Sequence, residues 1–184
     1  MSVETGKSAF IHSRRLEAYS YPSDCPFNIS RAGKVKKILN SMGLLSGSSI
    51  IKAEPRAAER MELKKFHTAR YLHTLKNASR GKWDLEALHM GIGTGDCPLF
   101  KGMYNYSVLA CGATLTGAEM ILSGEVTNAF NPSGGLHHAM PERASGFCYI
   151  NDMAIACMKL AEKGKKVFSA CGQDNGDGFT EVDV

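Results

Sequence analysis

Short apolar runs rich in β-branched or aromatic residues predict the strands of this chain. They lie at residues 8–12, 50–51, 126–130 and 166–168. The run at residues 126–130 leads directly into a segment that contains three glycines and two histidines. Any site at the end of that strand is therefore expected to involve this segment.

Apolar residues spaced three and four positions apart predict helices between these runs. The expected helices are residues 31–42, 55–66, 68–75, 106–122 and 152–162. Thr68 is expected to cap the third of them, because its side-chain oxygen can accept a backbone N–H of the first turn. Gly43 and Gly164 are expected to end the first and the last.

Glycine, proline and polar residues predict loops at residues 24–30, 77–82 and 91–98. Strands that alternate with helices predict an α/β fold with a largely parallel sheet flanked by helices. Such folds bind ligands at the carboxyl ends of their strands. The segment after residues 126–130 is therefore the first candidate for a site.

Two adjacent histidines, His137 and His138, dominate this segment. They follow the glycine pair at 134–135 and precede Gly146 and Phe147. Histidine transfers protons readily near neutral pH, and neighbouring side chains on a looping backbone can take different roles. The alternative is a surface loop with two solvated histidines.

Composition and charge limit the remaining possibilities. The chain has 184 residues, of which 43% are hydrophobic and 22% charged, and a net charge of +4 without a long basic run. We expect no direct nucleic-acid binding, and no apolar run approaches the roughly 18 residues of a membrane span. The six cysteines show no metal-binding spacing. They predict reduced thiols in a soluble, cytoplasmic protein.

Other motifs carry less chemistry. Residues 91–95 superficially match a dinucleotide fingerprint but follow no strand and lead into proline rather than a helix. Residues 173–178 fit part of a calcium loop but lack carboxylates at its first and last positions. The other histidines have no partner at ligand spacing and are expected to be structural or solvated: His12, His67, His73 and His89.

Taken together, several motifs between residues 10 and 168 resemble the zinc-dependent histone deacetylases. The resemblance is to the bacterial acetoin-utilisation-type and class I-like members in particular. It rests on Pro26 with Arg31, residues 66–68, residues 95–98, residues 134–139 and residues 144–149. It implies the arginase/deacetylase fold, with the site at the strand ends.

The resemblance also implies an activity. The reaction would be hydrolysis of acetyl-lysine, or of a small acetylated amine, by a water molecule that zinc activates. His137 and His138 would handle the proton of that water. Gly146 and Phe147 would line a narrow tunnel for the acetyl-lysine stem.

Two further residues acquire expected roles in substrate binding from the resemblance. Asp96 would accept hydrogen bonds from the substrate backbone at the rim. Arg31 would lie beside an inner pocket through which acetate leaves.

The chain departs from the family pattern in its last residues. The family carries an Asp-x-Asp-x-His-His-Gly-Asp-Gly run whose second Asp and first His bind zinc. Aligned on residues 176–178, this chain places Gly172 and Asp174 at those two positions. Glycine has no side chain to offer a metal, so Asp174 is a weak candidate ligand and zinc binding by this chain is doubtful.

The supporting carboxylates are also incomplete. Ala170 stands where a carboxylate would support His137, whereas Asp177, the carboxylate expected behind His138, is present. We therefore expect residues 1–184 to form a partial deacetylase-like domain with an atypical tail at 169–184. A truncation, a frameshift or a degenerate copy would each explain this tail.

Two functional hypotheses remain: an active zinc deacetylase, and a catalytically inactive homologue. A partial domain would also leave its parallel sheet with an open edge and uncovered apolar surface. A partner chain that covers this sheet is a further possibility.

Overall fold

A three-stranded parallel sheet lies at the centre of the computed structural model, which describes residues 6–169. Strand β1 (Ser8–Ile11) pairs in parallel with β2 (Ile50–Ala53) on one side and with β3 (Asn128–Phe130) on the other. Ala9 lies opposite Ile51 and Ala129 in these two pairings. The predicted α/β class with a parallel sheet is confirmed.

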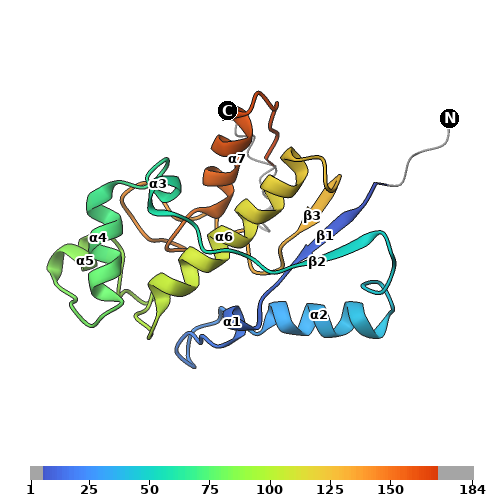
Figure 1. Ribbon diagram of the computed structural model, residues 1–184. Coiled ribbons are helices and arrows are strands. Elements are labelled where there is room, and N and C mark those ends of the chain that lie inside the picture. Colours follow the sequence, from blue (N-terminus) through green and yellow to red (C-terminus); the bar gives the residue numbers. More distant parts are fainter. Residues whose placement is uncertain (1–5, 170–184) are drawn as a thin grey trace, which may run out of the picture.

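Helices flank this sheet on both faces (Figure 1), with α2 on one side and the long α6 with α7 on the other. The helices are α1 (Arg14–Glu17), α2 (Arg31–Ser41), α3 (Arg60–Leu63), α4 (Ala69–Ala78), α5 (Leu85–His89), α6 (Met103–Leu122) and α7 (Asp152–Glu162). Thr68 caps α4 as predicted, since its hydroxyl oxygen accepts the N–H of Tyr71 at 3.3 Å.

Some predicted elements need correction. The helix expected at residues 55–66 is reduced to α3, because the backbone of residues 56–58 runs along α6 and Ala58 N donates to the carbonyl of Val108. Glu59 and Glu62 then form a capping box that starts the helix at Arg60. No strand occurs at residues 166–168, which have no neighbouring strand within the described residues.

Helix α6 is central to the packing of the fold, and two of its glycines let neighbouring segments pack closely against it. A Cβ at Gly117 would lie 2.9 Å from the Cβ of Ala129 in β3. A Cβ at Gly112 would lie 2.0 Å from the carbonyl oxygen of Arg56. Glycine at these positions lets the helix approach β3 and residues 56–58 directly.

Among the helices of residues 6–169, none combines the length and the apolar character that a membrane span requires.

An apolar cavity of about 480 Å³ lies between β3, α6 and α7. Its lining includes Ile121, Ala129, Met153, Leu160 and Phe168. Strand β3 is the last strand of the sheet on this side, and within the described residues nothing pairs with its outer edge. Phe130 is 50% exposed and Phe168 71%. Within residues 6–169, an unpaired strand edge and apolar surface therefore occur together.

Candidate active site

The loop that follows β3 is anchored by a buried carboxylate. Asp152, at the start of α7, accepts the backbone N–H of Leu136 at 2.6 Å and that of Gly135 at 3.1 Å. It also accepts the hydroxyl of Thr114 on α6. Complete burial raises the pKa of Asp152, whereas these three donors act to lower it. Residues 135–136 are thereby fixed to both long helices.

Asn151 holds the next part of the loop. Its side-chain oxygen accepts the N–H of Ala154 and so caps α7. Its amide nitrogen donates to the carbonyls of His137 and Ala139, at 3.0 and 2.9 Å. Its backbone N–H donates to Nε2 of His67 at 3.0 Å. The backbone on both sides of His138 is therefore tied to the first turn of α7.

The two predicted histidines lie side by side on this support. The ring centroids of His137 and His138 are 4.1 Å apart, with the planes inclined by 43°. Nδ1 of His137 donates to the carbonyl of Gly135 at 3.0 Å, so Nε2 is the basic nitrogen of the neutral ring. Burial and the neighbouring His137 lower the pKa of His138, while the Asp96 carboxylate opposes this. His138 is therefore a neutral ring at neutral pH, as a general base must be.

Gly146 and Phe147 form a tight turn against these histidines. A Cβ at Gly146 would lie 2.6 Å from the ring of His138, so only glycine fits. Phe147 has a φ of 62°, which is unusual for a residue with a side chain. Asp96 accepts Gly146 N at Oδ2 and Phe147 N at its carbonyl, at 2.7 and 3.0 Å. The Tyr21 hydroxyl donates to the Phe147 carbonyl at 2.6 Å. Asp96 and Tyr21 together hold the turn at residues 146–147 in place.

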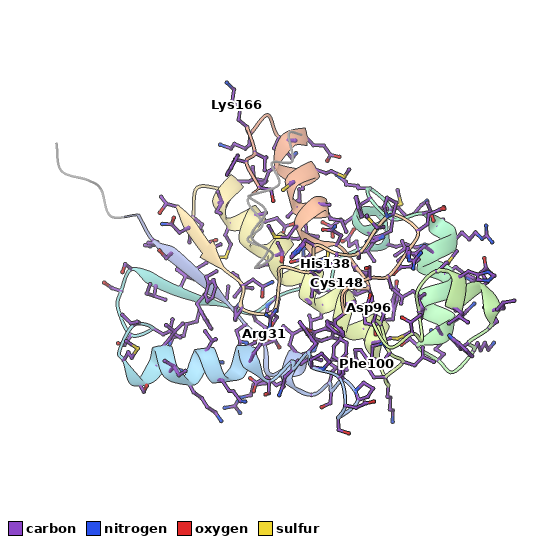
Figure 2. All side chains as sticks on the ribbon, turned by 180° about the vertical axis from the view of Figure 1, so that it is seen from behind. Arg31, Asp96, Phe100, His138, Cys148 and Lys166 are labelled. Atoms are coloured by element: carbon purple, nitrogen blue, oxygen red, sulfur yellow. The ribbon has the colours of Figure 1, made fainter. Side chains whose placement is uncertain are left out.

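Arg31 reaches the same loop from α2. Its guanidinium donates to the carbonyl of Gly134 at 3.3 Å and lies 4.9 Å from the centre of the Phe27 ring. Phe27 in turn stacks on Phe147. Arg31, Asp96, His138 and Cys148 lie around the centre of the molecule in Figure 2, whereas Lys166 projects from its tip. The structure thus brings Arg31 and Asp96, which come from distant parts of the sequence, to the loop that carries the histidines, Gly146 and Phe147.

The nearby thiols are not suited to nucleophilic chemistry. Burial raises the pKa of Cys97 to about 12 and that of Cys148 to about 11. Both thiols are therefore protonated at neutral pH, and a thiol attacks only as a thiolate. The five cysteines within the described residues carry free thiols, as predicted.

The described residues do not fit a zinc ion. Within residues 6–169, no group of three or more His, Cys, Asp or Glu side chains could hold a metal. The candidate ligand Asp174, the substituted position Gly172, and the supporting positions Ala170 and Asp177 all lie outside the described residues. The two histidine rings therefore have no metal centre beside them among residues 6–169.

Sequence reasoning missed the residues that hold the loop in place. Asn151 and Asp152 stand immediately before a helical pattern, where capping residues are common. Their position at the start of a predicted helix is the sequence signal that could have identified this role. His67, expected to be structural or solvated, is structural and buried, with 1% of its surface exposed. Nothing in the sequence connects Tyr21 to Phe147, because these residues are 126 positions apart.

Comparison with known proteins agrees with the resemblance in the motifs. A family model described as the histone deacetylase domain matches residues 25–169. The acetoin utilization protein AcuC of Bacillus subtilis (strain 168) is 35% identical over 181 residues, covering 96% of this chain and 46% of that protein. Histone deacetylase 8 of Xenopus tropicalis is 39% identical over 155 residues, covering 83% and 41%.

A solved structure gives the same result in three dimensions. The crystal structure of an HDAC homologue from Aquifex aeolicus superposes with a TM-score of 0.76 and 37% sequence identity, covering 87% of this chain and 42% of that one. The chain therefore spans less than half the length of the relatives it matches. Within that span, sequence and fold agree: the chain belongs to the histone deacetylase domain family.

Proposed function

We propose that this chain forms the proton-transfer and substrate-binding part of a deacetylase that hydrolyses acetyl-lysine or a small acetylated amine. The observation that carries the proposal is the pair His137–His138, whose rings lie 4.1 Å apart. The lowered pKa of His138 suits it to accept a proton from an attacking water molecule. His137, with Nε2 as its basic nitrogen, is the second proton-transfer group of the pair.

The residues around the pair suit an extended acylated side chain. Phe147 and Gly146 would flank the apolar stem of the substrate, and Asp96 would bind its backbone at the rim. Arg31 would line the inner end, where the acetate product forms. Asp96 bonds the turn of Gly146 against the His138 ring, and Arg31 bonds the carbonyl of Gly134 on the same loop, which supports these roles.

The proposed enzyme needs zinc ligands from outside residues 6–169, which supply no metal site. Beyond them, Asp174 stands at one ligand position of the family pattern, and Asp177 is a further candidate catalytic carboxylate. A specific observation therefore favours a second candidate, a catalytically inactive deacetylase homologue. Ala170 and Gly172 stand where the family carries carboxylates, and neither can bind a metal or orient a histidine.

One experiment separates the two candidates. The purified chain is assayed for bound zinc and for release of acetate from an acetyl-lysine peptide and from an acetylated diamine. The deacetylase proposal expects turnover that is lost in His138→Ala and kept in the exposed-site control His73→Ala. A folded chain that binds no zinc and releases no acetate would establish the inactive homologue instead.

Location and partners follow from features outside the histidine loop. The free thiols support a cytoplasmic location. The open edge of β3 and the adjoining apolar cavity support a partner, or further polypeptide, that covers this side of the sheet. Residues 1–184 would then act as a partial domain with an atypical tail at 169–184.

A further inference from the structure

The backbone around the histidine pair depends on one side-chain amide. Asn151 donates from Nδ2 to the carbonyl of His137 at 3.0 Å and to that of Ala139 at 2.9 Å. These two carbonyls lie on either side of His138. A single amide group therefore sets the path of the chain through both histidines.

Asn151 is itself fixed at two points. Its Oδ1 accepts the N–H of Ala154 at 2.9 Å, and its backbone N–H donates to Nε2 of His67 at 3.0 Å. Capping uses only Oδ1, and aspartate would cap α7 equally well. The two Nδ2 bonds therefore serve the histidine loop and not the helix.

His67 provides a rigid acceptor for this arrangement. Because a backbone N–H must donate, Nε2 of His67 carries no proton, and Nδ1–H faces the carbonyl of Pro141 at 3.3 Å. The ring packs edge-on against Phe66 and stacks on Tyr71 at an interplanar angle of 26°, with centroids 4.9 and 5.2 Å away. Burial lowers the pKa of His67 to about 4, so the ring keeps this neutral form at neutral pH.

We propose that His67 and Asn151 are positioning residues, which hold the His137–His138 backbone in the geometry that proton transfer requires. This inference rests on the proposed function, because it assigns a purpose to the geometry of the same pair. Neither residue touches the reacting atoms. Both act through the loop. A displacement of a catalytic group by about 1 Å can cost about 100-fold in rate, even when the cause lies far from the reacting atoms.

The first test needs no substitution. In the ¹⁵N-labelled chain, an N–H···N hydrogen bond gives a scalar coupling between the backbone nitrogen of Asn151 and Nε2 of His67. We expect this coupling, together with the Nδ1–H tautomer of His67. A His67 ring with its proton on Nε2 would overturn the proposal.

The second test uses three variants and one control. Asn151→Asp keeps the helix cap and removes both donors to the loop. His67→Phe keeps the ring packing and removes the acceptor, whereas His67→Gln supplies Oε1 as a substitute acceptor. His73→Gln, at an exposed position of α4, is the control.

The readout is the NMR titration of His137 and His138. The groups that face His138 are His137, the Asp96 carboxylate and the Cys148 thiol, to which His138 N donates. We expect the pKa of His138 to rise towards its ordinary value in His67→Phe, which adds no charge, with weaker contacts between the two rings. In Asn151→Asp the added carboxylate also raises this pKa, so the weakened contacts between the rings are the readout there. In His67→Gln and His73→Gln, the titration of His137 and His138 should match that of the unaltered chain.

Titration curves unchanged in folded Asn151→Asp and His67→Phe would overturn the proposal. If Asn151→Asp does not fold, the comparison of His67→Phe with His67→Gln decides alone. None of these measurements uses zinc or substrate. A chain that fails to deacetylate therefore defeats the proposed function, whereas unchanged titration in an active chain defeats only the positioning role.

Discussion

The carboxylate of Asp152 accepts the backbone N–H of Leu136 at 2.6 Å, and so joins the first turn of α7 to the loop that carries the histidines. Asp152→Asn keeps the size of the side chain but turns an NH₂ group towards backbone donors. We expect the free energy of unfolding to fall by about 1–3 kcal/mol, the usual cost of leaving a buried polar group unsatisfied. Urea denaturation measures this change, and Asp24→Asn at an exposed position should leave stability unaltered.

His67 makes stability depend on pH in the acidic range. Its pKa is lowered from 6.5 in the unfolded chain to about 4 in the folded one, by burial. The folded state therefore binds fewer protons, and this contribution is complete above pH 6.5 and is lost as pH falls towards 4. At about 1.4 kcal/mol per pH unit, the loss amounts to about 3 kcal/mol.

The measurement is urea denaturation of the unaltered chain and of His67→Phe across this range. The difference between their unfolding free energies should shrink as pH falls. A constant difference would show that His67 does not titrate in this window.

Gly146 is expected to tolerate no side chain. In Gly146→Ala the new Cβ would lie 2.6 Å from the His138 ring, at a φ of 53°. We expect His138 to be displaced, with a change in its NMR titration and a loss of about 1–3 kcal/mol in stability. Gly95→Ala is the matched control, since no atom lies within 4 Å of its Cβ position. Equal stability and equal His138 titration in the two variants would contradict the expected clash with the His138 ring.

An ion-pair network joins residues 56–62 to α6 and α7. Glu62 accepts two bonds from Arg56, at 2.6 and 2.7 Å, and one from Lys159 at 3.0 Å. The Arg56 guanidinium lowers the pKa of Glu62 to about 2, more than burial raises it. Glu119 shares both partners but is more exposed, with 37% of its side chain accessible against 14% for Glu62.

Glu62→Gln should therefore destabilise the fold by about 2 kcal/mol, and Glu119→Gln by less than about 1 kcal/mol. Because the folded-state pKa of Glu62 is lowered, its contribution is present above pH 4.5 and is lost as pH falls towards 2. Thermal denaturation at pH 7 and at pH 3 tests both the ranking and the sign. The reverse ranking would show that exposure does not decide the strength of these pairs.

The apolar surface beside β3 should bind hydrophobic dyes and promote self-association. We expect Phe130→Lys together with Phe168→Lys to reduce both, because lysine at a strand edge opposes edge-to-edge pairing. Light scattering and dye fluorescence provide the measurements. Leu85→Lys, at an exposed position on α5, is the control for the added charge. Unchanged scattering in the double variant would mean that association uses another face.

Local signals in the sequence were sufficient for most elements of the fold. Helix α7 begins and ends where the spacing predicts, since Asn151 caps it and Gly164 follows it. The predicted helix at residues 55–66 was wrong at both ends, since only Arg60–Leu63 is helical. At its start, packing against α6 draws residues 56–58 out of helical geometry. Tertiary contact decides such cases, and periodicity does not record it.

The site was predictable only where a motif carried it. The resemblance identified His137, His138 and the turn at residues 146–147. Their mutual geometry depends on His67 and Tyr21, which lie far away in the sequence and have no pattern of their own. The roles of the predicted site residues remain predictions, and those at 170–178 fall outside the described residues.

The bond between Tyr21 and Phe147 spans 126 positions, and that between His67 and Asn151 spans 84. Bonds between such distant positions form only after most of the intervening chain has been ordered. The turn at Phe147 is therefore among the last features to form. A nascent chain would contain the two histidines well before it could hold them together.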